Sequence, residues 1–149
     1  MRKLLTLVAI LTIAPFVLAQ NLHCRQVGGS ISTNFLNPST TFGSATGDLK
    51  GGIGVNVLNI SSGSNGATVF HNQHDWVTES GDTLYLRDAD ATAYPAAGAL
   101  VAINYVKGVD VIGGTGRFAD ATGHLDVWGA ADLQHKQIVL RYKGEICGD

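Results

Sequence analysis

The sequence is poor in charge and holds no cluster of basic residues. Charged side chains make up 15% of the chain, and the formal net charge is -2. Contacts with phosphate need concentrated positive charge, so nucleic acid is not expected as a partner. Beyond the N-terminus, no apolar run has membrane-spanning length and no segment carries a sustained helical stripe. These absences argue against a helical fold and against an internal membrane anchor.

The short motifs of several common catalytic and nucleotide sites are also missing. No serine lies in a GxSxG pattern, so a hydrolase nucleophile elbow is not indicated. The glycine-rich stretch Gly113–Gly129 lacks the Lys-Ser/Thr pair of a phosphate-binding loop, because Arg117 follows Gly116. Ala119 stands where a dinucleotide fingerprint needs its third glycine. The residues beyond alternate like a strand, so the helix N-terminus that binds anions is missing too.

Only two cysteines occur, Cys24 and Cys147, near opposite ends of the chain. Their spacing fits neither a CxxC redox motif nor a zinc site. In an exported protein the default interpretation of such a pair is a disulfide, which would make the first and last strands neighbours. The alternative is that both are free or intermolecular thiols.

The N-terminus predicts export. Met1–Lys3 is basic, and Leu4–Leu18 is an almost unbroken apolar run that leads to Ala19. This pattern is typical of a signal peptide, and the run is shorter than the ~20 residues of a membrane-spanning helix. We expect residues 1–19 to be removed, residues 20–149 to form one domain, and the mature protein to be secreted, either extracellular or periplasmic. No association with a membrane is expected after cleavage.

Short segments of alternating apolar and polar residues fill the mature chain, separated by Gly, Asn, Ser and Asp. This pattern predicts strands and hairpins. We predict strands at 49–60, 67–78, 83–87, 99–112, 124–133 and 137–146. The fourth of these could break at Gly108, while Pro95 and the alanines of 88–98 predict a loop. About eight antiparallel strands with neighbouring termini favour a closed β-barrel, which can hold side chains or one small ligand.

The stretch Gly113–Gly129 fits a backbone role, with glycines at strand ends and turns and Phe118 in the core. The motif GGTGRFADATGHL, followed by a strand and LRYKGEI, resembles the allene oxide cyclase and dirigent superfamily. The hairpin motif is matched at Gly113, Gly114, Thr115, Gly116, Phe118, Ala119, Ala121 and Gly123, and then at Gly144. The resemblance spans about 49–146 and implies a calycin-like β-barrel, an exported bacterial member of unassigned activity, and homo-oligomers such as trimers.

Candidate functional residues are concentrated on the strand predicted at 67–78. Alternation puts Phe70, Asn72, His74 and Trp76 on one face of it, and His71, Gln73 and Asp75 on the other. The two histidines therefore cannot chelate together on a regular strand, and neither a metal nor a cofactor is predicted. We hypothesise that a cavity is lined by Asn72, His74, Trp76, Tyr105 and Tyr142. The alternative is that these side chains simply fill the core.

Two functional classes stay open at this point. The first is a non-catalytic exported barrel that binds a small apolar ligand or a partner surface. The second, implied by the resemblance, is a cofactor-free cyclase or dirigent-like enzyme that holds a reactive substrate in a folded shape. A cavity with a positioned His or carboxylate would favour the enzyme, and a filled barrel with an exposed apolar patch would favour an interaction protein. No catalytic residue is predicted, and purely structural roles form a remaining class.

Overall fold

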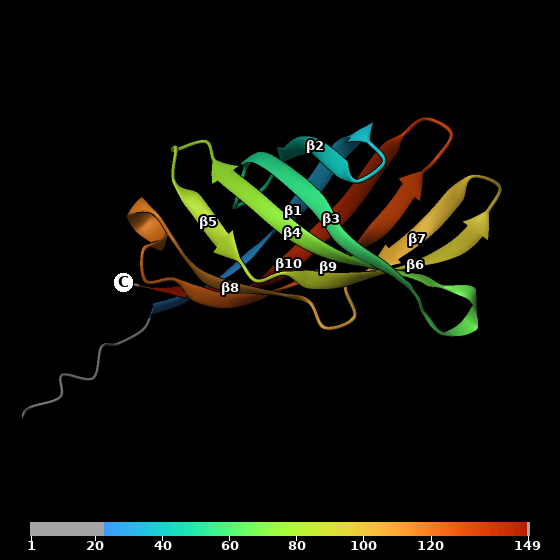
Figure 1. The fold of residues 1–149 in the computed structure, drawn as a ribbon. Helices are drawn as coiled ribbons and strands as arrows, with labels where there is room; N and C mark the ends of the chain where they lie inside the picture. The colour runs from blue at the N-terminus through green and yellow to red at the C-terminus, as the bar shows by residue number, and fades with distance from the viewer. Residues whose placement is uncertain (1–22, 149) are drawn as a thin grey trace, which may run out of the picture.

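The computed structural model describes residues 23–148, so the expected signal peptide lies outside the described residues (Figure 1). Most of the described chain is strand. The elements in chain order are β1 (His23–Asn37), β2 (Thr40–Ala45), β3 (Gly51–Ser62), η1 (Ser64–Gly66), β4 (Thr68–Thr78), β5 (Thr83–Leu86), β6 (Ala89–Ala97), β7 (Leu100–Asn104), β8 (Val109–Gly114), η2 (Gly116–Phe118), β9 (Thr122–Asp132) and β10 (Gln137–Gly148). No helix in this range is long and apolar enough to span a membrane.

The strands form a closed antiparallel β-barrel with eight strand positions, as predicted. β1 to β4 follow one another as neighbours, β10 pairs with both β1 and β9, and this closes the sheet. Two positions are each shared by two short strands. β5 and β6 pair with different halves of β4, and β7 and β8 pair with different halves of β9.

The sequence patterns locate six strand segments close to their observed bounds, including a break at Gly108 that separates β7 from β8. The loop predicted at 88–98 is wrong, because Ala89–Ala97 forms strand β6. Pro95 is tolerated there because pairing with β4 ends at Ala93 and the register with β7 shifts just beyond the proline. The alanines alternate as a strand requires, with Ala91 and Ala93 buried.

The glycines of the stretch Gly113–Gly129 allow backbone conformations and close contacts that other residues would not, as predicted. Gly114 ends β8, and a side chain there would overlap the carbonyl oxygen of Thr83 and the side chain of Phe118. Gly116 has φ 52°, which suits glycine, and starts the turn η2. That turn delivers Phe118 into the core, where the side chain is buried. The stretch is therefore a strand end, a turn and a new strand.

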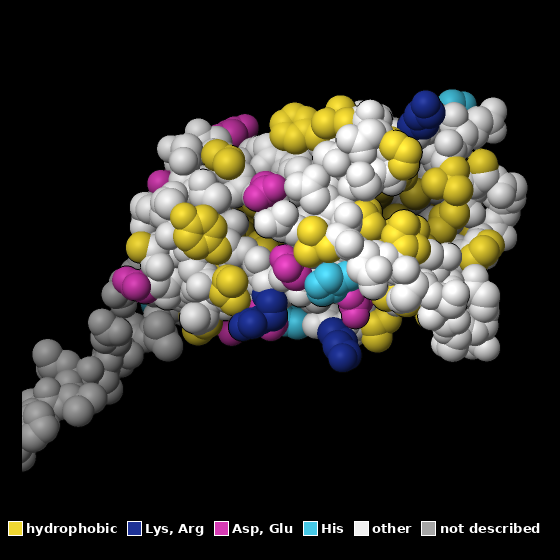
Figure 2. All heavy atoms as spheres, viewed as in Figure 1, with side chains coloured by type: hydrophobic (Ala, Val, Ile, Leu, Met, Phe, Trp, Pro, Cys, Tyr) yellow, Lys and Arg dark blue, Asp and Glu magenta, His cyan; other side chains and the backbone are white. Residues whose placement is uncertain are grey.

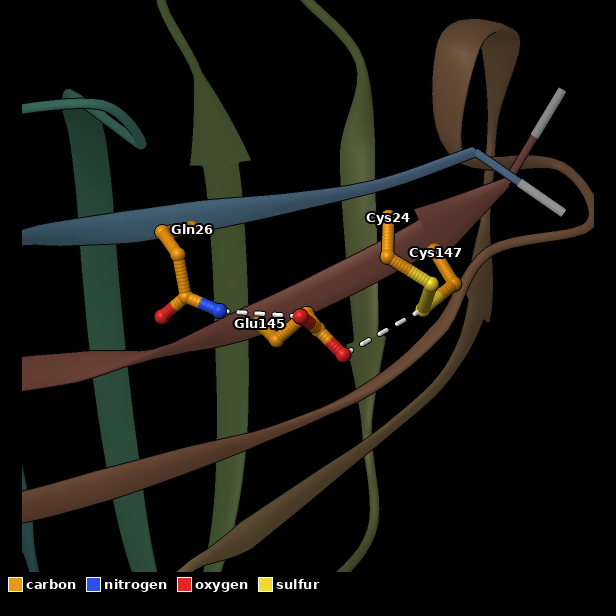
Figure 3. The surroundings of a disulfide bond; sticks show 4 residues. All are labelled: Cys24, Gln26, Glu145 and Cys147. Atoms are coloured by element: carbon orange, nitrogen blue, oxygen red, sulfur yellow. Dashed lines mark hydrogen bonds between the residues drawn. A yellow bond between two sulfur atoms is a disulfide. The ribbon is translucent and has the colours of Figure 1, made fainter.

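Cys24 and Cys147 form a disulfide between β1 and β10, which confirms the predicted pairing (Figure 3). The two residues lie directly opposite each other in the register. The bond joins positions 123 residues apart. In the chain-entropy model, closing a loop of this length stabilises the fold by about 5 kcal/mol.

The two ends of the barrel differ. One end holds the β2–β3 loop, the β4–β5 turn, η2 and the disulfide, and we call it the closed end (Figure 1). The largest fully buried side chains are Trp76, Tyr142, Phe118, Leu49, Leu84 and Leu125. The other end is formed by the β1–β2, β3–β4, β6–β7 and β9–β10 hairpins, and we call it the open end.

Candidate ligand-binding cavity

A cavity of about 360 Å³ occupies the barrel toward the open end. Its walls are mostly apolar and come from every strand position of the barrel. The partly exposed residues at its mouth include Phe35, Pro38, Val57, Pro95, Val101 and Leu133. Figure 2 shows hydrophobic side chains gathered around a hollow at this end of the molecule. Trp76 and Leu125, both almost fully buried, lie on the cavity wall nearest the solid core.

Strand β4 supplies two of the buried polar side chains of the wall, Asn72 and His74, and Thr33 of β1 and Thr41 of β2 supply two more. As the alternation predicts, Asn72, His74 and Trp76 face the interior and line the cavity. His71 faces outward, where its Nδ1 lies 2.8 Å from an oxygen of Asp90. The two histidines of this strand therefore lie on opposite faces, as the alternation predicts.

Tyr105 reaches the same place from the break between β7 and β8. Its backbone amide donates to Val127 O, and its carbonyl accepts from the amide of Gly108, whose φ is 63°. This turn interrupts the strand and leaves the Tyr105 side chain buried in the cavity wall. Its hydroxyl oxygen accepts a hydrogen bond from Asn72 Nδ2 at 3.2 Å and lies 3.0 Å from His74 Nε2. We call these three side chains the polar cluster.

The polar cluster does not satisfy all of its own hydrogen-bonding groups. In the arrangement in which Tyr105 accepts from Asn72 and donates to His74 Nε2, the ring proton of His74 is on Nδ1. Among the described residues, His74 Nδ1 and Asn72 Oδ1 have no partner although both atoms are buried. An unsatisfied buried polar group costs about 1–3 kcal/mol. The cluster thus contains one unpartnered donor and one unpartnered acceptor.

Burial also keeps the polar cluster uncharged. It lowers the pKa of His74 from 6.5 to about 4, while nearby Asp88 opposes the shift and His71 adds to it. Burial raises the pKa of Tyr105 to about 12, against the opposing effect of the hydrogen bond from Asn72. Both groups are neutral near pH 7. Among the described residues that line the cavity, none is Asp, Glu, Lys or Arg.

Tyr142 is a correction to the predicted lining, because it is not among the cavity residues. Its ring packs edge-on against Trp76, with the ring centroids 5.2 Å apart. Its hydroxyl accepts a hydrogen bond from the amide of Leu49 and donates one to the carbonyl of Thr46. Burial raises its pKa. Tyr142 therefore ties the β2–β3 loop across the closed end.

The residues that make room for the cavity were not among the predicted lining residues. Ala91 and Ala93 of β6 line it, and they stand opposite Phe70 and Thr68 of β4. Small side chains beside larger ones leave space inside the barrel. The signal was the alternation in the segment ADATAYP, which the proline obscured.

The described residues contain one group of three possible metal ligands, formed by Cys24, Cys147 and Glu145. Both sulfurs are committed to the disulfide, so this group does not offer a set of thiolates. Figure 3 shows Glu145 held by Gln26, whose Nε2 donates to it at 2.8 Å. The disulfide and the hydrogen bond from Gln26 therefore explain why these three side chains lie close together.

No protein-family model, curated protein or solved structure matches the chain in comparisons with known proteins.

Proposed function

We propose that this protein binds one small, uncharged and largely apolar molecule inside its barrel. The observation that carries the proposal is a cavity of about 360 Å³ whose wall is apolar except for a few buried polar groups. Small-molecule sites in proteins typically enclose ~300–1,000 Å³ and combine apolar walls with a few oriented polar groups. The size and the chemistry of this cavity both fall in that class.

The uncharged wall argues for an uncharged ligand. An ion moved from water into an apolar cavity loses its hydration, and none of the described residues that line this cavity is charged. An apolar ligand instead gains about 25 cal/mol for each Å² of its surface that leaves water. The mouth residues, including Phe35, Pro38 and Leu133, would continue the apolar contact to the open end.

A partner surface is the other form of binding that the sequence allows. Phe42, Val77 and Tyr85 are exposed hydrophobic side chains on the outer face of β2, β4 and β5. The cavity offers the more specific chemistry, because it joins an enclosed apolar volume to unpartnered polar atoms. We therefore place the ligand inside the barrel.

We also propose that the protein is exported and acts outside the cytoplasm. The basic and apolar N-terminal segment supports this, since it has the form of a signal peptide. The disulfide supports it independently, because such bonds persist in oxidising compartments. The eight-stranded barrel supports the resemblance to the allene oxide cyclase and dirigent superfamily, which we keep as a proposal.

A cofactor-free cyclase is the second candidate, and one observation favours it. The cavity holds a positioned His74–Tyr105 pair, with 3.0 Å between ring nitrogen and hydroxyl oxygen. Proton transfer is most efficient when the pKa of the catalytic group is near the working pH. With a pKa of about 4 for His74 and about 12 for Tyr105, neither group fits that role at pH 7. We therefore rank binding above catalysis.

The experiment is mass spectrometry of small molecules that co-purify with the mature protein. Ala93→Phe would fill part of the cavity, and Val139→Ser would change an exposed side chain on the barrel exterior. We expect wild type and Val139→Ser to retain the same compound, and Ala93→Phe, His74→Ala and Trp76→Ala to lose it. Equal recovery from all variants, or no enrichment over a control purification, would refute binding in the cavity.

The compound that co-purifies with the protein also distinguishes a binding protein from a cyclase. It is incubated with fresh wild-type protein and analysed by chromatography coupled to mass spectrometry. A carrier returns the compound unchanged. A cyclase or isomerase converts it to a product of equal mass and different retention time, and His74→Ala slows that conversion.

A further inference from the structure

We infer that the polar cluster selects a ligand whose head group is uncharged and both donates and accepts a hydrogen bond, as a primary carboxamide or an alcohol does. This inference rests on the proposed function and specifies the ligand class. It follows from a count of hydrogen-bonding groups in Asn72, His74 and Tyr105.

At least one donor and one acceptor stay unpartnered however the protons are arranged. With Asn72 donating to Tyr105 and Tyr105 donating to His74, the unpartnered atoms are His74 Nδ1, which carries a proton, and the Asn72 carbonyl oxygen. If every bond is reversed, they are the Asn72 amide nitrogen and a bare His74 Nδ1. If Asn72 and His74 both donate to Tyr105, the Tyr105 proton, the Asn72 carbonyl oxygen and a bare His74 Nδ1 are left. A head group that only accepts, or only donates, would leave one of them unsatisfied.

Ionised head groups are excluded by the surroundings of the polar cluster. A carboxylate could accept from His74 but would face the Asn72 carbonyl oxygen, and an ammonium group would face the ring proton of His74. Neither ion would find a counter-charge, because the described cavity wall has no Asp, Glu, Lys or Arg. Asp88 acts on His74 from outside this wall.

The position of the polar cluster along β4 orients the ligand. Asn72 and His74 lie between Phe70, on the side of the open end, and Trp76, on the side of the solid core. A bound molecule would therefore place its head group against β4 and Tyr105 in the interior. Its apolar part would extend past Phe70 toward mouth residues such as Phe35.

Four probes that share one alkyl chain test the inference: octanamide, 1-octanol, methyl octanoate and octanoate. Binding to the wild-type mature protein is measured by isothermal titration calorimetry at pH 7.4. We expect octanamide and 1-octanol to bind about tenfold more tightly than methyl octanoate, which cannot donate, since one hydrogen bond is lost. Octanoate should bind most weakly. Equal affinity for all four, or tighter binding of the ester or the carboxylate, would overturn the inference.

Paired variants test which side chains cause the preference for octanamide over methyl octanoate. His74→Phe and Asn72→Leu remove the groups inside the barrel, whereas His71→Phe and Gln73→Leu make the same kinds of change on the outer face. We expect the inner variants to lose the preference for octanamide over methyl octanoate and the outer variants to keep it. A preference that survives in both inner variants would also overturn the inference. Circular dichroism checks the fold, and the wild-type panel gives a result even if an inner variant fails to fold.

The outcomes also separate this inference from the proposed function. Binding of all four probes with one affinity, abolished by Ala93→Phe, would refute selection of the head group and leave cavity binding supported. The absence of binding by all four probes, combined with no compound co-purifying with the protein, would count against both.

Discussion

The closed and open ends of the barrel use buried polar side chains in opposite ways. At the closed end, Trp76 donates to the carbonyl of Leu49, and Tyr142 bonds both Leu49 and Thr46. These partners are backbone groups of the β2–β3 loop, so each bond fixes the chain. Toward the open end, the polar cluster bonds mainly within itself and leaves two buried atoms unpartnered. The first arrangement stabilises the fold, and the second leaves two polar atoms unpaired in side chains that line the cavity.

The largest effect is expected from the disulfide at the closed end. Replacing Cys24 and Cys147 together by serine should lower the free energy of unfolding by about 4–5 kcal/mol, because the unfolded chain regains the entropy of a long open loop. Urea unfolding of the variant and wild type measures the difference. Alkylation of the folded wild type should label neither cysteine, and labelling of both would contradict the bond.

The next prediction compares two leucines of one strand, β5. Leu84 is 1% exposed in the solid core, whereas Leu86 lines the cavity and is only partly buried. Leu84→Ala should lower the free energy of unfolding by about 3–4 kcal/mol, because it leaves a new void in packed surroundings. Leu86→Ala enlarges an existing space and should cost less than half as much. Equal losses in urea unfolding would mean that the two ends are packed alike.

His74 should make stability depend on pH within a defined window. Its pKa is about 4 in the folded protein and 6.5 without burial, so the unfolded state binds a proton first as the pH falls. The contribution of neutral His74 to the free energy of unfolding is therefore fully present above about pH 6.5. It is lost as the pH falls toward 4, and the loss is about 3 kcal/mol for a shift of this size.

Urea unfolding at pH 7.5, 5.5 and 4 checks this window, with His74→Phe as the variant that should lack the decrease. Two carboxyl groups titrate outside this window. A hydrogen bond from His124 lowers the pKa of Asp110, and one from His135 lowers the pKa of Asp132, so both carboxyls lose their contribution to stability only at more acidic pH. A variant with the same slope as wild type between pH 6.5 and 4 would assign the effect to another group.

The smallest expected effect separates the two buried tyrosines. Tyr142→Phe leaves the buried amide of Leu49 without a partner and should cost about 1–3 kcal/mol. Tyr105→Phe removes a hydroxyl from a cluster that borders the cavity, where water could replace it as a partner of Asn72 and His74, so its cost should be smaller, about 1 kcal/mol. Thermal melting of both variants gives the order. The reverse order would show that the polar cluster is a structural element.

Much of the fold could be predicted from local patterns. The alternation in β4 correctly indicates that Asn72, His74 and Trp76 share the inner face. Strand β6 was missed because Pro95 is tolerated only where its β4 side has no pairing partner, and that depends on where the β4–β6 pairing ends. A proline signal acts locally, whereas strand pairing joins residues far apart in the sequence.

Local sequence patterns set the period of the strands, the turns at glycines and the two cysteines available for a bond. Which inward-facing residues meet space and which meet packed neighbours depends on how the strands come together in the barrel. Tyr105 and Tyr142 were both predicted to line the cavity, yet only Tyr105 does so, and Tyr142 ties the loop at the closed end. The physical reason is that alternation sets the face of a side chain, whereas closure of the barrel sets its depth and its partners.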